Sequence, residues 1–331
     1  MKLIYIDTKN TNPYVNLSME EYLLSVAERE QCLVLYFWQN TDTIVIGRNQ
    51  NAYTECNVKK AQQQKVFIAR RKTGGGAVFH DMGNLNFTFI YPKALYEQRQ
   101  SLGIISNAMR SLGFNVEVVG RNDVSVNGYK FSGSAFYSND KVGMHHGTIM
   151  VAVDCNKLAS LLNVSKNKLS THGVASVRSR VKNLKELNAC ITIEQIKQAL
   201  LKSFLQYFDD QIQDIIYDFN FDNVVLQKLY LQYASPNWNM GEFQTYTLSR
   251  TKRFNWGEVY VYADVDGKSI KRIALASDSL YPSRILLIER ILNNLNANSD
   301  DIVDTSLFDK DTQLIFQDIL SVYQSVLEEI V

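Results

Sequence analysis

The sequence contains few of the residues that build disulfide or metal frameworks: only four cysteines and four histidines occur among its 331 residues. The cysteines, Cys32, Cys56, Cys155 and Cys190, are scattered without paired spacing, which favours free thiols in a cytoplasmic protein. No two histidines lie four residues apart, the spacing at which two ligands share a helix face. We therefore expect neither a disulfide framework nor a structural zinc site.

Excess charge and long apolar runs are also missing. The 35 basic and 34 acidic residues leave a net charge of +1, so no global field favours nucleic acid or a membrane surface. No apolar run approaches the roughly 18 residues of a membrane-spanning helix, and the run from Met1 to Asp7 is too short for a signal peptide. These absences predict a cytoplasmic protein that binds neither nucleic acid nor membranes. The chain length suggests about two domains.

The most unusual stretch runs from Ala69 to Asn84 and joins three basic residues to three glycines. Consecutive glycines cost backbone entropy and have no side chains to pack in a core. They suit a place where the backbone must approach a ligand closely, with amide N–H groups pointing at it. Because Arg70, Arg71 and Lys72 precede the glycines, we expect that ligand to be an anion. The alternative is a flexible hairpin tip with solvated charges.

The order of residues in this stretch excludes the two commonest nucleotide motifs. A Walker loop needs Gly-Lys followed by Ser or Thr after its glycines, whereas here the basic residues come first. The dinucleotide fingerprint spaces its glycines apart. The stretch therefore indicates a phosphate or carboxylate site in a different fold.

A hairpin is predicted between Asp123 and Ser132, because Asn-Gly at its centre is the strongest short hairpin signal. A two-residue turn places Val124 opposite Phe131 on an apolar face. The second face then carries Asp123, Ser125, Lys130 and Ser132. The small residues from Ser132 to Ala135 leave room for a ligand beside the amine of Lys130.

Two further stretches carry candidate binding residues. His145 and His146 are adjacent in a predicted strand and must point to opposite faces, so at most one enters a given cleft. Between Cys155 and Lys185 there are seven cations and no acidic residue. Its middle, Ser165–Asn183, is predicted to be a long loop, either a solvated connector, a basic lid over a phosphate-bearing ligand, or a dock for an acidic partner.

The remaining pattern predicts a mixed arrangement of strands and helices. We expect an edge strand over residues 2–7, a helix capped by Asn16, a buried strand over Cys32–Trp38 paired with Thr43–Gly47, and a helix over Thr54–Lys65.

In the C-terminal part, a capping box of Thr192 and Gln195 starts another helix. Ser235–Glu242 is the best linker candidate, and a hairpin around Asp266-Gly267 with two helices follows it.

Together these motifs resemble the lipoate–protein ligase A family. The resemblance is carried, in order along nearly the whole chain, by Arg70-Arg71-x-x-Gly-Gly-Gly-Ala-Val-Phe-His-Asp, Gly120-Arg121-Asn122-Asp123, Lys130-x-Ser-Gly-Ser-Ala, His145-His146-Gly-Thr and Ser176-Val-Arg-Ser-Arg-Val. It implies an α+β fold, with a catalytic domain of the biotin/lipoyl-synthetase type over residues 1–242, a mixed sheet flanked by helices, and a small α+β accessory domain over 243–331.

The resemblance also implies a reaction. Lipoate and ATP form lipoyl-AMP and pyrophosphate, and the lipoyl group then passes to a lysine of an apo carrier domain, in a 2-oxoacid dehydrogenase E2 subunit or the glycine-cleavage H protein. Mg2+ is expected with ATP. The acid-free segment around Ser170–Lys182 is expected to close over the adenylate.

The site residues are carried over by motif position. Arg71 and the run Gly76, Ala77, Val78 and Phe79 are expected to contact ATP and the adenylate. Lys130 is expected to bridge the lipoate carbonyl and the α-phosphate as a cation, not as a nucleophile. Other expected substrate and ATP residues are Arg70, Gly74, Gly75, His80, Asn84, Asp123, Gly133, His146 and Arg178. Asp123 either holds Mg2+ or orients Lys130, and the sequence leaves both open.

Three alternatives compete with the ligase. An ATP-independent lipoyl or octanoyl transferase would keep the fold, but it would need a nucleophilic cysteine, and Cys155 matches no such motif. A biotin–protein ligase has a different order in its basic glycine motif. A non-catalytic lipoate-binding protein is expected to have lost Lys130 or the arginine pair, and both are retained.

Overall fold

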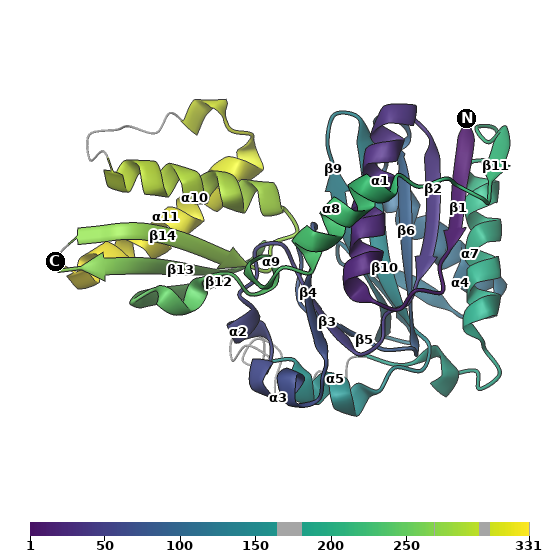
Figure 1. Ribbon diagram of the computed structural model, residues 1–331, viewed down its shortest axis with the longest axis horizontal. Helices are drawn as coiled ribbons and strands as arrows, with labels where there is room; N and C mark the ends of the chain where they lie inside the picture. Colours follow the sequence, from purple (N-terminus) through teal and green to yellow (C-terminus); the bar gives the residue numbers. More distant parts are fainter. Residues whose placement is uncertain (164–180, 268, 298–304, 331) are drawn as a thin grey trace. The chain divides into compact units, whose positions relative to one another are not determined.

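The computed structural model describes residues 1–331 except 164–180, 268, 298–304 and 331 (Figure 1). The chain forms two compact units, each assembled from separate stretches of sequence. The first unit consists of Met1–Val45, Asn57–Ala69 and Val78–Ser235. The second consists of Ile46–Cys56, Arg70–Ala77 and Pro236–Val331, so two stretches of the N-terminal half group with the C-terminal residues. The linear boundary after residue 242 stays a prediction.

The first unit is built on one mixed sheet. In spatial order its strands are β11 (Asp214–Ile216), β1 (Lys2–Asp7), β2 (Leu33–Trp38), β6 (Asn84–Pro92), β10 (Val142–Met150), β9 (Tyr129–Ser138), β8 (Asp123–Val126) and β7 (Val116–Val119). The three strands β11, β1 and β2 run parallel, and every other neighbouring pair is antiparallel. The predicted mixed sheet is therefore confirmed.

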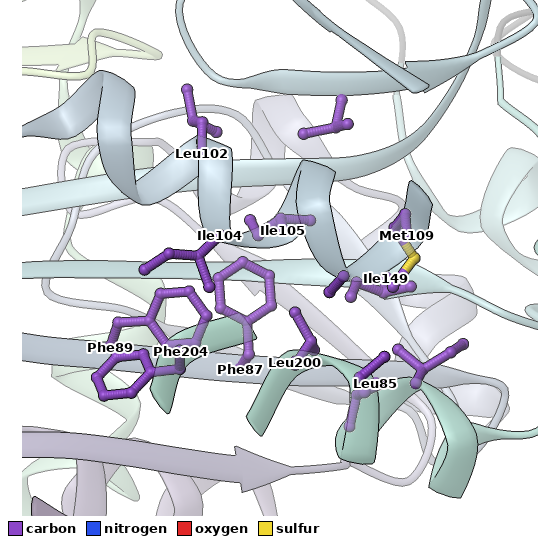
Figure 2. Close-up of a cluster of buried hydrophobic side chains, with 14 of the residues drawn as sticks. Leu85, Phe87, Phe89, Leu102, Ile104, Ile105, Met109, Ile149, Leu200 and Phe204 are labelled. Carbon is purple, nitrogen blue, oxygen red and sulfur yellow. The ribbon is translucent and has the colours of Figure 1, made fainter. Parts of the chain in front are cut away.

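Helices cover both faces of this sheet. Those of the first unit are α1 (Pro13–Glu30), α3 (Val58–Gln63), α4 (Gln98–Ser111), α5 (Cys155–Leu161), α7 (Ile193–Tyr207) and α8 (Asn223–Tyr233), with short turns η1 (Lys93–Leu95) and η3 (Leu184–Glu186). On one face, side chains of α4 and α7 form a buried cluster with Phe87 and Phe89 of β6 (Figure 2). On the other face α1 packs against β6 and β10, and α8 packs against α1. The two faces of β10 therefore meet different surroundings.

A smaller three-stranded sheet has the order β4 (Phe67–Arg70), β3 (Thr43–Ile46) and β5 (Val78–His80). In the sequence, β4 precedes the three consecutive glycines and β5 follows them. Here the prediction for Thr43–Gly47 was wrong, because β3 pairs with β5 and not with β2. The prediction that residues 2–7 form an edge strand was also wrong, since β11 pairs with β1 on its outer side. Only three residues of β11 are in the ladder, too few to show a period in the sequence.

Two helix predictions also need correction. Asn12, not Asn16, caps α1: its side-chain oxygen accepts from the amides of Tyr14 and Val15, while Asn16 lies inside the helix. The helix predicted over Thr54–Lys65 is broken into α2 (Ala52–Glu55) and α3, because Asn57 caps a new helix start. The capping box of Thr192 and Gln195 is confirmed.

The C-terminal part of the second unit is an α+β module. Its sheet has the order β12 (Leu248–Phe254), β13 (Gly257–Asp266) and β14 (Ser269–Ser277), and α10 (Pro282–Ala297) and α11 (Lys310–Ile330) pack on it. A buried cluster of Val, Ile, Leu and aromatic side chains joins the sheet to these helices. The predicted hairpin around Asp266-Gly267 is confirmed. The linker candidate contains a short helix, α9 (Pro236–Met240), followed by the turn η4 (Phe243–Thr245); η5 (Thr305–Leu307) precedes α11.

Among the helices of the described residues, none combines the length and apolar character that crossing a membrane requires.

Candidate active site

The amine of Lys130 lies in an ion pair on strand β9. Its Nζ is 2.7 Å from Oδ1 of Asp123 on the neighbouring strand β8, and the two side chains are 37% and 31% exposed. The predicted common face of these two residues is confirmed. A half-exposed ammonium held beside a carboxylate is positioned for an incoming anion without the cost of full burial.

The register of the hairpin differs from the prediction. Val124 lies opposite Ser132, not Phe131, because the ladder shifts between Val124 and Ser125. Ser132 is consequently buried behind the sheet instead of sharing the face of Lys130, and Gly133 takes its place. A β-bulge of this kind adds one residue to a strand and re-aims the side chains that follow it.

Gly133 is in close contact with the lysine. A Cβ added at Gly133 would lie 3.0 Å from both Cε and Nζ of Lys130. Any side chain there would push the ammonium away from Asp123. The space at Gly133 is therefore taken by the lysine side chain itself, and room for a ligand beside the amine stays a prediction.

The two histidines of β10 point to opposite faces, as predicted. His145 is fully buried, stacked on Phe136 with ring centroids 4.5 Å apart and edge-on to Phe87 and Phe89. Burial, with a smaller contribution from His146, lowers the pKa of His145 well below its usual value, so this ring is neutral. Its role is to fill the aromatic core.

His146 faces helix α1, where a polar network lies under the sheet. Its Nδ1 is 2.7 Å from Oε1 of Glu20, and the same oxygen accepts from the Thr88 hydroxyl at 2.6 Å. The Thr88 oxygen in turn accepts from the indole N–H of Trp38 at 3.0 Å. A carboxylate in contact with Nδ1 fixes which ring nitrogen carries the proton. The network thus holds the imidazole in one orientation and one tautomer.

Glu20 and Thr88 were missed by the sequence interpretation. A signal for Glu20 exists: it lies three residues after Leu17 and four before Leu24, on the apolar side of α1. A carboxylate at such a position must find a buried partner. Nothing in the sequence names His146 as that partner, since the two are separated by 126 positions.

His80, at the end of β5, and Asn84, at the start of β6, are both buried. The Nδ1 of His80 is 3.2 Å from the Asn40 amide nitrogen, and its ring lies edge-on to Trp38. Asn84 donates from its side chain to Oδ1 of Asn86 at 2.9 Å. In the described part of the chain, the amide nitrogen of Asn86 is buried without a hydrogen-bond partner. This unused donor is an additional candidate for a ligand contact.

The three consecutive glycines, Gly74 to Gly76, belong to the second unit, and their surroundings differ. A Cβ at Gly74 would lie 2.2 Å from the carbonyl oxygen of Ser279, so no side chain fits there. Gly75 has φ +90°, and its N–H donates to the same carbonyl at 2.9 Å. Around Gly76, by contrast, a Cβ would meet nothing within 4 Å. Close packing thus accounts for Gly74 and Gly75, and open space for an incoming ligand lies at Gly76.

Arg71 stays close to this loop. Its Nη2 donates to the carbonyls of Gly74 at 2.6 Å and of Gly76 at 2.8 Å, and its Nε donates to the Thr73 hydroxyl at 3.1 Å. The guanidinium therefore lies along the inner side of the loop and supplies positive charge at its glycines. The side chain of Arg70 instead donates to main-chain carbonyls outside the glycines, among them those of Trp238 and Asn239.

The predicted site residues belong to both units. The first unit contains Val78, Phe79, His80, Asn84, Asp123, Lys130, Gly133 and His146, and the second contains Arg70, Arg71, Gly74, Gly75, Gly76 and Ala77. Phe79 is buried opposite Ile44 in the small sheet, and Val78 is half-buried. Arg178 and most of the acid-free segment lie outside the described residues.

The two buried cysteines lack the surroundings of an activated nucleophile. Burial raises the pKa of the Cys32 thiol to about 11 and that of the Cys56 thiol to about 12. Cys155 is half-buried with its sulfur 3.7 Å from the side-chain nitrogen of Asn183, and Cys190 is exposed. Because the attacking species is the thiolate, neither buried cysteine is suited to carry an acyl group.

A metal would find one carboxylate beside Lys130. Within the described residues, no group of three or more Asp, Glu, His or Cys side chains could hold a metal ion by itself. Mg2+ commonly binds through one or two carboxylates together with substrate phosphates. Asp123 alone therefore fits a magnesium ion that arrives with a nucleotide.

These features define a protein of two units, with a lysine-bearing mixed sheet in the first and an α+β module in the C-terminal part of the second. Residues 12–205 match the family model described as lipoyl protein ligase A/B catalytic domain, and residues 244–321 match bacterial lipoate protein ligase C-terminus. The chain belongs to the lipoate–protein ligase A family.

Individual relatives agree with this membership. The chain is 37% identical over 309 residues to lipoate-protein ligase A of Psychrobacter cryohalolentis, covering 91% of both. Its fold is similar to P. falciparum LipL1 in complex with lipoate, with a TM-score of 0.79 and 28% identity over 97% of this chain and all of that one. An archaeal bipartite lipoate protein ligase from Thermoplasma acidophilum, described with its E2 lipoyl domain, gives a TM-score of 0.62 and 25% identity over 72% of this chain and 96% of that one.

Proposed function

We propose that this protein is an ATP-dependent lipoate ligase that forms lipoyl-AMP and transfers the lipoyl group to a lysine of a carrier domain. The family membership supports the ligase activity. The observation that carries the site is the Lys130 ammonium, held 2.7 Å from Asp123 beside a glycine that leaves it no competing side chain.

The reaction has two balanced steps. In the first, a lipoate carboxylate oxygen forms a bond to the α-phosphorus of ATP, the bond to the bridging oxygen breaks, and pyrophosphate leaves. In the second, the amine of the carrier lysine attacks the acyl carbon, AMP leaves, and the amine loses a proton. A free carboxylate is a poor acyl donor, and the adenylate supplies the missing leaving group.

Lys130 is assigned to the charge that develops in both steps. A cation beside the acyl carbonyl and the α-phosphate stabilises the oxygens that gain negative charge. Arg71 is assigned to the nucleotide phosphates from the glycine side, where its guanidinium already lies along Gly74 and Gly76. The acyl chain needs an apolar slot, for which Val78 and Phe79 remain the candidates.

Asp123 would hold Mg2+ together with the triphosphate. When bound, Mg2+ supplies neutralisation of the charge on the leaving pyrophosphate. In this assignment Asp123 has two roles, because its Oδ1 also orients Lys130.

The acceptor is assigned as an apo lipoyl carrier domain, an E2 subunit or the glycine-cleavage H protein. The relative from Thermoplasma acidophilum is described with its E2 lipoyl domain, which supports this class of partner. The protein is assigned to the cytoplasm, the compartment that four cysteines without paired spacing favour.

The test is pyrophosphate release from ATP with Mg2+ and lipoate, followed by mass spectrometry of an added apo lipoyl domain. The proposal predicts release that depends on lipoate, and a gain of one lipoyl mass on the carrier. A mass gain that needs no ATP, and appears only when an acylated carrier is the donor, would identify a transferase instead. A carrier whose lysine is changed to arginine is the control for the site of attachment.

A further inference from the structure

The side chain of Arg70 is buried in a cage of main-chain carbonyls. Its Nε donates to the Trp238 carbonyl at 2.7 Å, and its Nη2 donates to that of Asn239 at 2.9 Å. Its Nη1 faces three more carbonyls, those of Gly47 at 3.1 Å, Arg48 at 3.0 Å and Gln50 at 2.5 Å. In the described residues these five carbonyls take up the donors of a guanidinium that is only 3% exposed.

The main chain of Arg70 is held in the same place. Its N–H donates to the Asn239 side-chain oxygen at 2.8 Å, and its carbonyl accepts from the Trp238 indole N–H at 2.9 Å. Helix α9 thus contacts both the main chain and the side chain of Arg70. Every one of these partners belongs to the second unit.

The carbonyls on Nη1 belong to a loop, Gly47–Gln50, that forms the floor of the glycine-rich stretch. The Arg48 N–H donates to the Thr73 carbonyl at 2.8 Å, directly before the glycines. A Cβ added at Gly47 would lie 2.1 Å from the carbonyl oxygen of Gly75, so the two backbones touch. The position of Gly75 therefore depends on the position of Gly47, which Arg70 fixes.

The guanidinium of Arg70 is poorly suited to binding a phosphate in addition to these carbonyls. Burial, with the neighbouring cations Arg48 and Arg71, lowers the pKa of its guanidinium to about 10. To reach a phosphate, Arg70 would have to leave several buried carbonyls without donors, which is unfavourable because a buried acceptor without a partner has lost its hydrogen bonds to water. Arg71 is also buried, but its Nη2 donates to the carbonyls of Gly74 and Gly76, so its guanidinium already lies at the glycines to which the phosphates are assigned.

We propose that Arg70 is a positioning residue that sets the glycine-rich loop through the Gly47–Gln50 floor, and that it does not contact the nucleotide. The expected effect on catalysis rests on the proposed function. The inference assigns the two adjacent arginines different roles. Arg71 is the one that meets the phosphates.

The test compares Arg70→Lys with Arg71→Lys in the full chain, since both keep the charge and lose the guanidinium. Backbone hydrogen exchange is measured at Arg48 and Gly75, together with kcat and KM for ATP in pyrophosphate release. Arg110→Lys is the matched control, because this exposed arginine of the first unit donates to one main-chain carbonyl, that of Val116 at 3.0 Å, and to the exposed Oδ1 of Asn107 at 3.5 Å.

For Arg70→Lys we expect exchange at both amides to accelerate at least ~10-fold, an amount that matches one lost hydrogen bond. We expect kcat to fall about 100-fold with KM for ATP unchanged, as a misplaced loop requires. Arg71→Lys should instead raise KM for ATP and leave exchange at Arg48 unchanged. Arg110→Lys should match the parent protein in all three quantities.

Two outcomes would overturn the inference. One is unchanged exchange with a raised KM for ATP in Arg70→Lys, which would make Arg70 a ligand. The other is an Arg70→Lys variant with a lowered melting temperature but a normal kcat when assayed below that temperature, which would make Arg70 merely structural. If Arg70→Lys does not fold, Gly47→Ala should reproduce the loss of kcat, and normal kcat there would overturn the inference. A parent protein without lipoate-dependent release would refute the proposed function, while the exchange data would still decide the anchoring by Arg70.

Discussion

Oδ1 of Asp123 on β8 lies 2.7 Å from Nζ of Lys130 on the neighbouring strand β9. Gly133 follows Lys130 three positions later on the same strand. The contact depends on a shifted register, because Asp123 pairs with Gly133 while Lys130 pairs with Ser125. The bulge therefore brings the ammonium, the carboxylate and the glycine to one point of the sheet.

Lys130→Ala should lower the rate of lipoyl-AMP formation about 100- to 1000-fold, the usual cost of removing one donor to a developing anion. The free energy of unfolding should change by less than about 1 kcal/mol, because the ion pair is partly exposed. Lipoate-dependent pyrophosphate release and urea unfolding measure the two quantities. Asp123→Asn is the control, which keeps the ammonium and should retain more activity. Near-normal release by Lys130→Ala would contradict the assignment.

Gly74→Ala should destabilise the protein by about 1–3 kcal/mol, because its Cβ would clash with the Ser279 carbonyl oxygen. Gly76→Ala should leave stability unchanged, since a Cβ there meets open space. Thermal unfolding of the two variants provides the comparison. Equal stability of both would mean that the loop does not pack on Ser279 in solution.

Glu20→Ala should cost about 1–3 kcal/mol for each buried group that loses its acceptor, here the Thr88 hydroxyl and the His146 Nδ1–H. Glu20→Gln keeps an acceptor oxygen and should cost less. Equilibrium urea unfolding at pH 7 measures both. A Glu20→Ala variant as stable as the parent would show that water replaces the carboxylate.

Stability should fall as the pH drops below about 6.5, the ordinary pKa of histidine. Because the pKa of His145 is lower in the folded state, the unfolded chain takes up this proton first. The contribution of His145 is therefore complete above that pH and decreases below it, by at most about 1.4 kcal/mol per pH unit.

His145→Leu, which cannot take up a proton, should reduce this slope. Urea unfolding between about pH 5 and pH 8 is the measurement, because this range brackets the ordinary histidine pKa of about 6.5. A slope that is the same in the variant would place the acid sensitivity elsewhere in the chain.

Much of the site could be predicted because its signals are local. The turn after Val126 and the opposite faces of His145 and His146 follow from neighbouring residues alone, as does the common face of Lys130 and Asp123. The bulge could not be predicted, since nothing in the sequence marks the extra residue between Lys130 and Gly133. The pairing of Glu20 with His146, 126 positions away, and of Arg70 with Trp238, 168 positions away, could not be predicted for a different reason: contacts at long range leave no period in the sequence.

The grouping of Ile46–Cys56 and Arg70–Ala77 with the C-terminal residues has a consequence for recombination. Both stretches lie inside the span that matches the catalytic family model, residues 12–205. A chimaera joined at residue 236 would therefore combine native loops with a foreign module, and the Ser279 and Trp238 contacts would meet altered surroundings. A functional exchange between relatives should transfer all three segments of the second unit together, Ile46–Cys56, Arg70–Ala77 and Pro236–Val331. Transferring the C-terminal segment alone should not be sufficient.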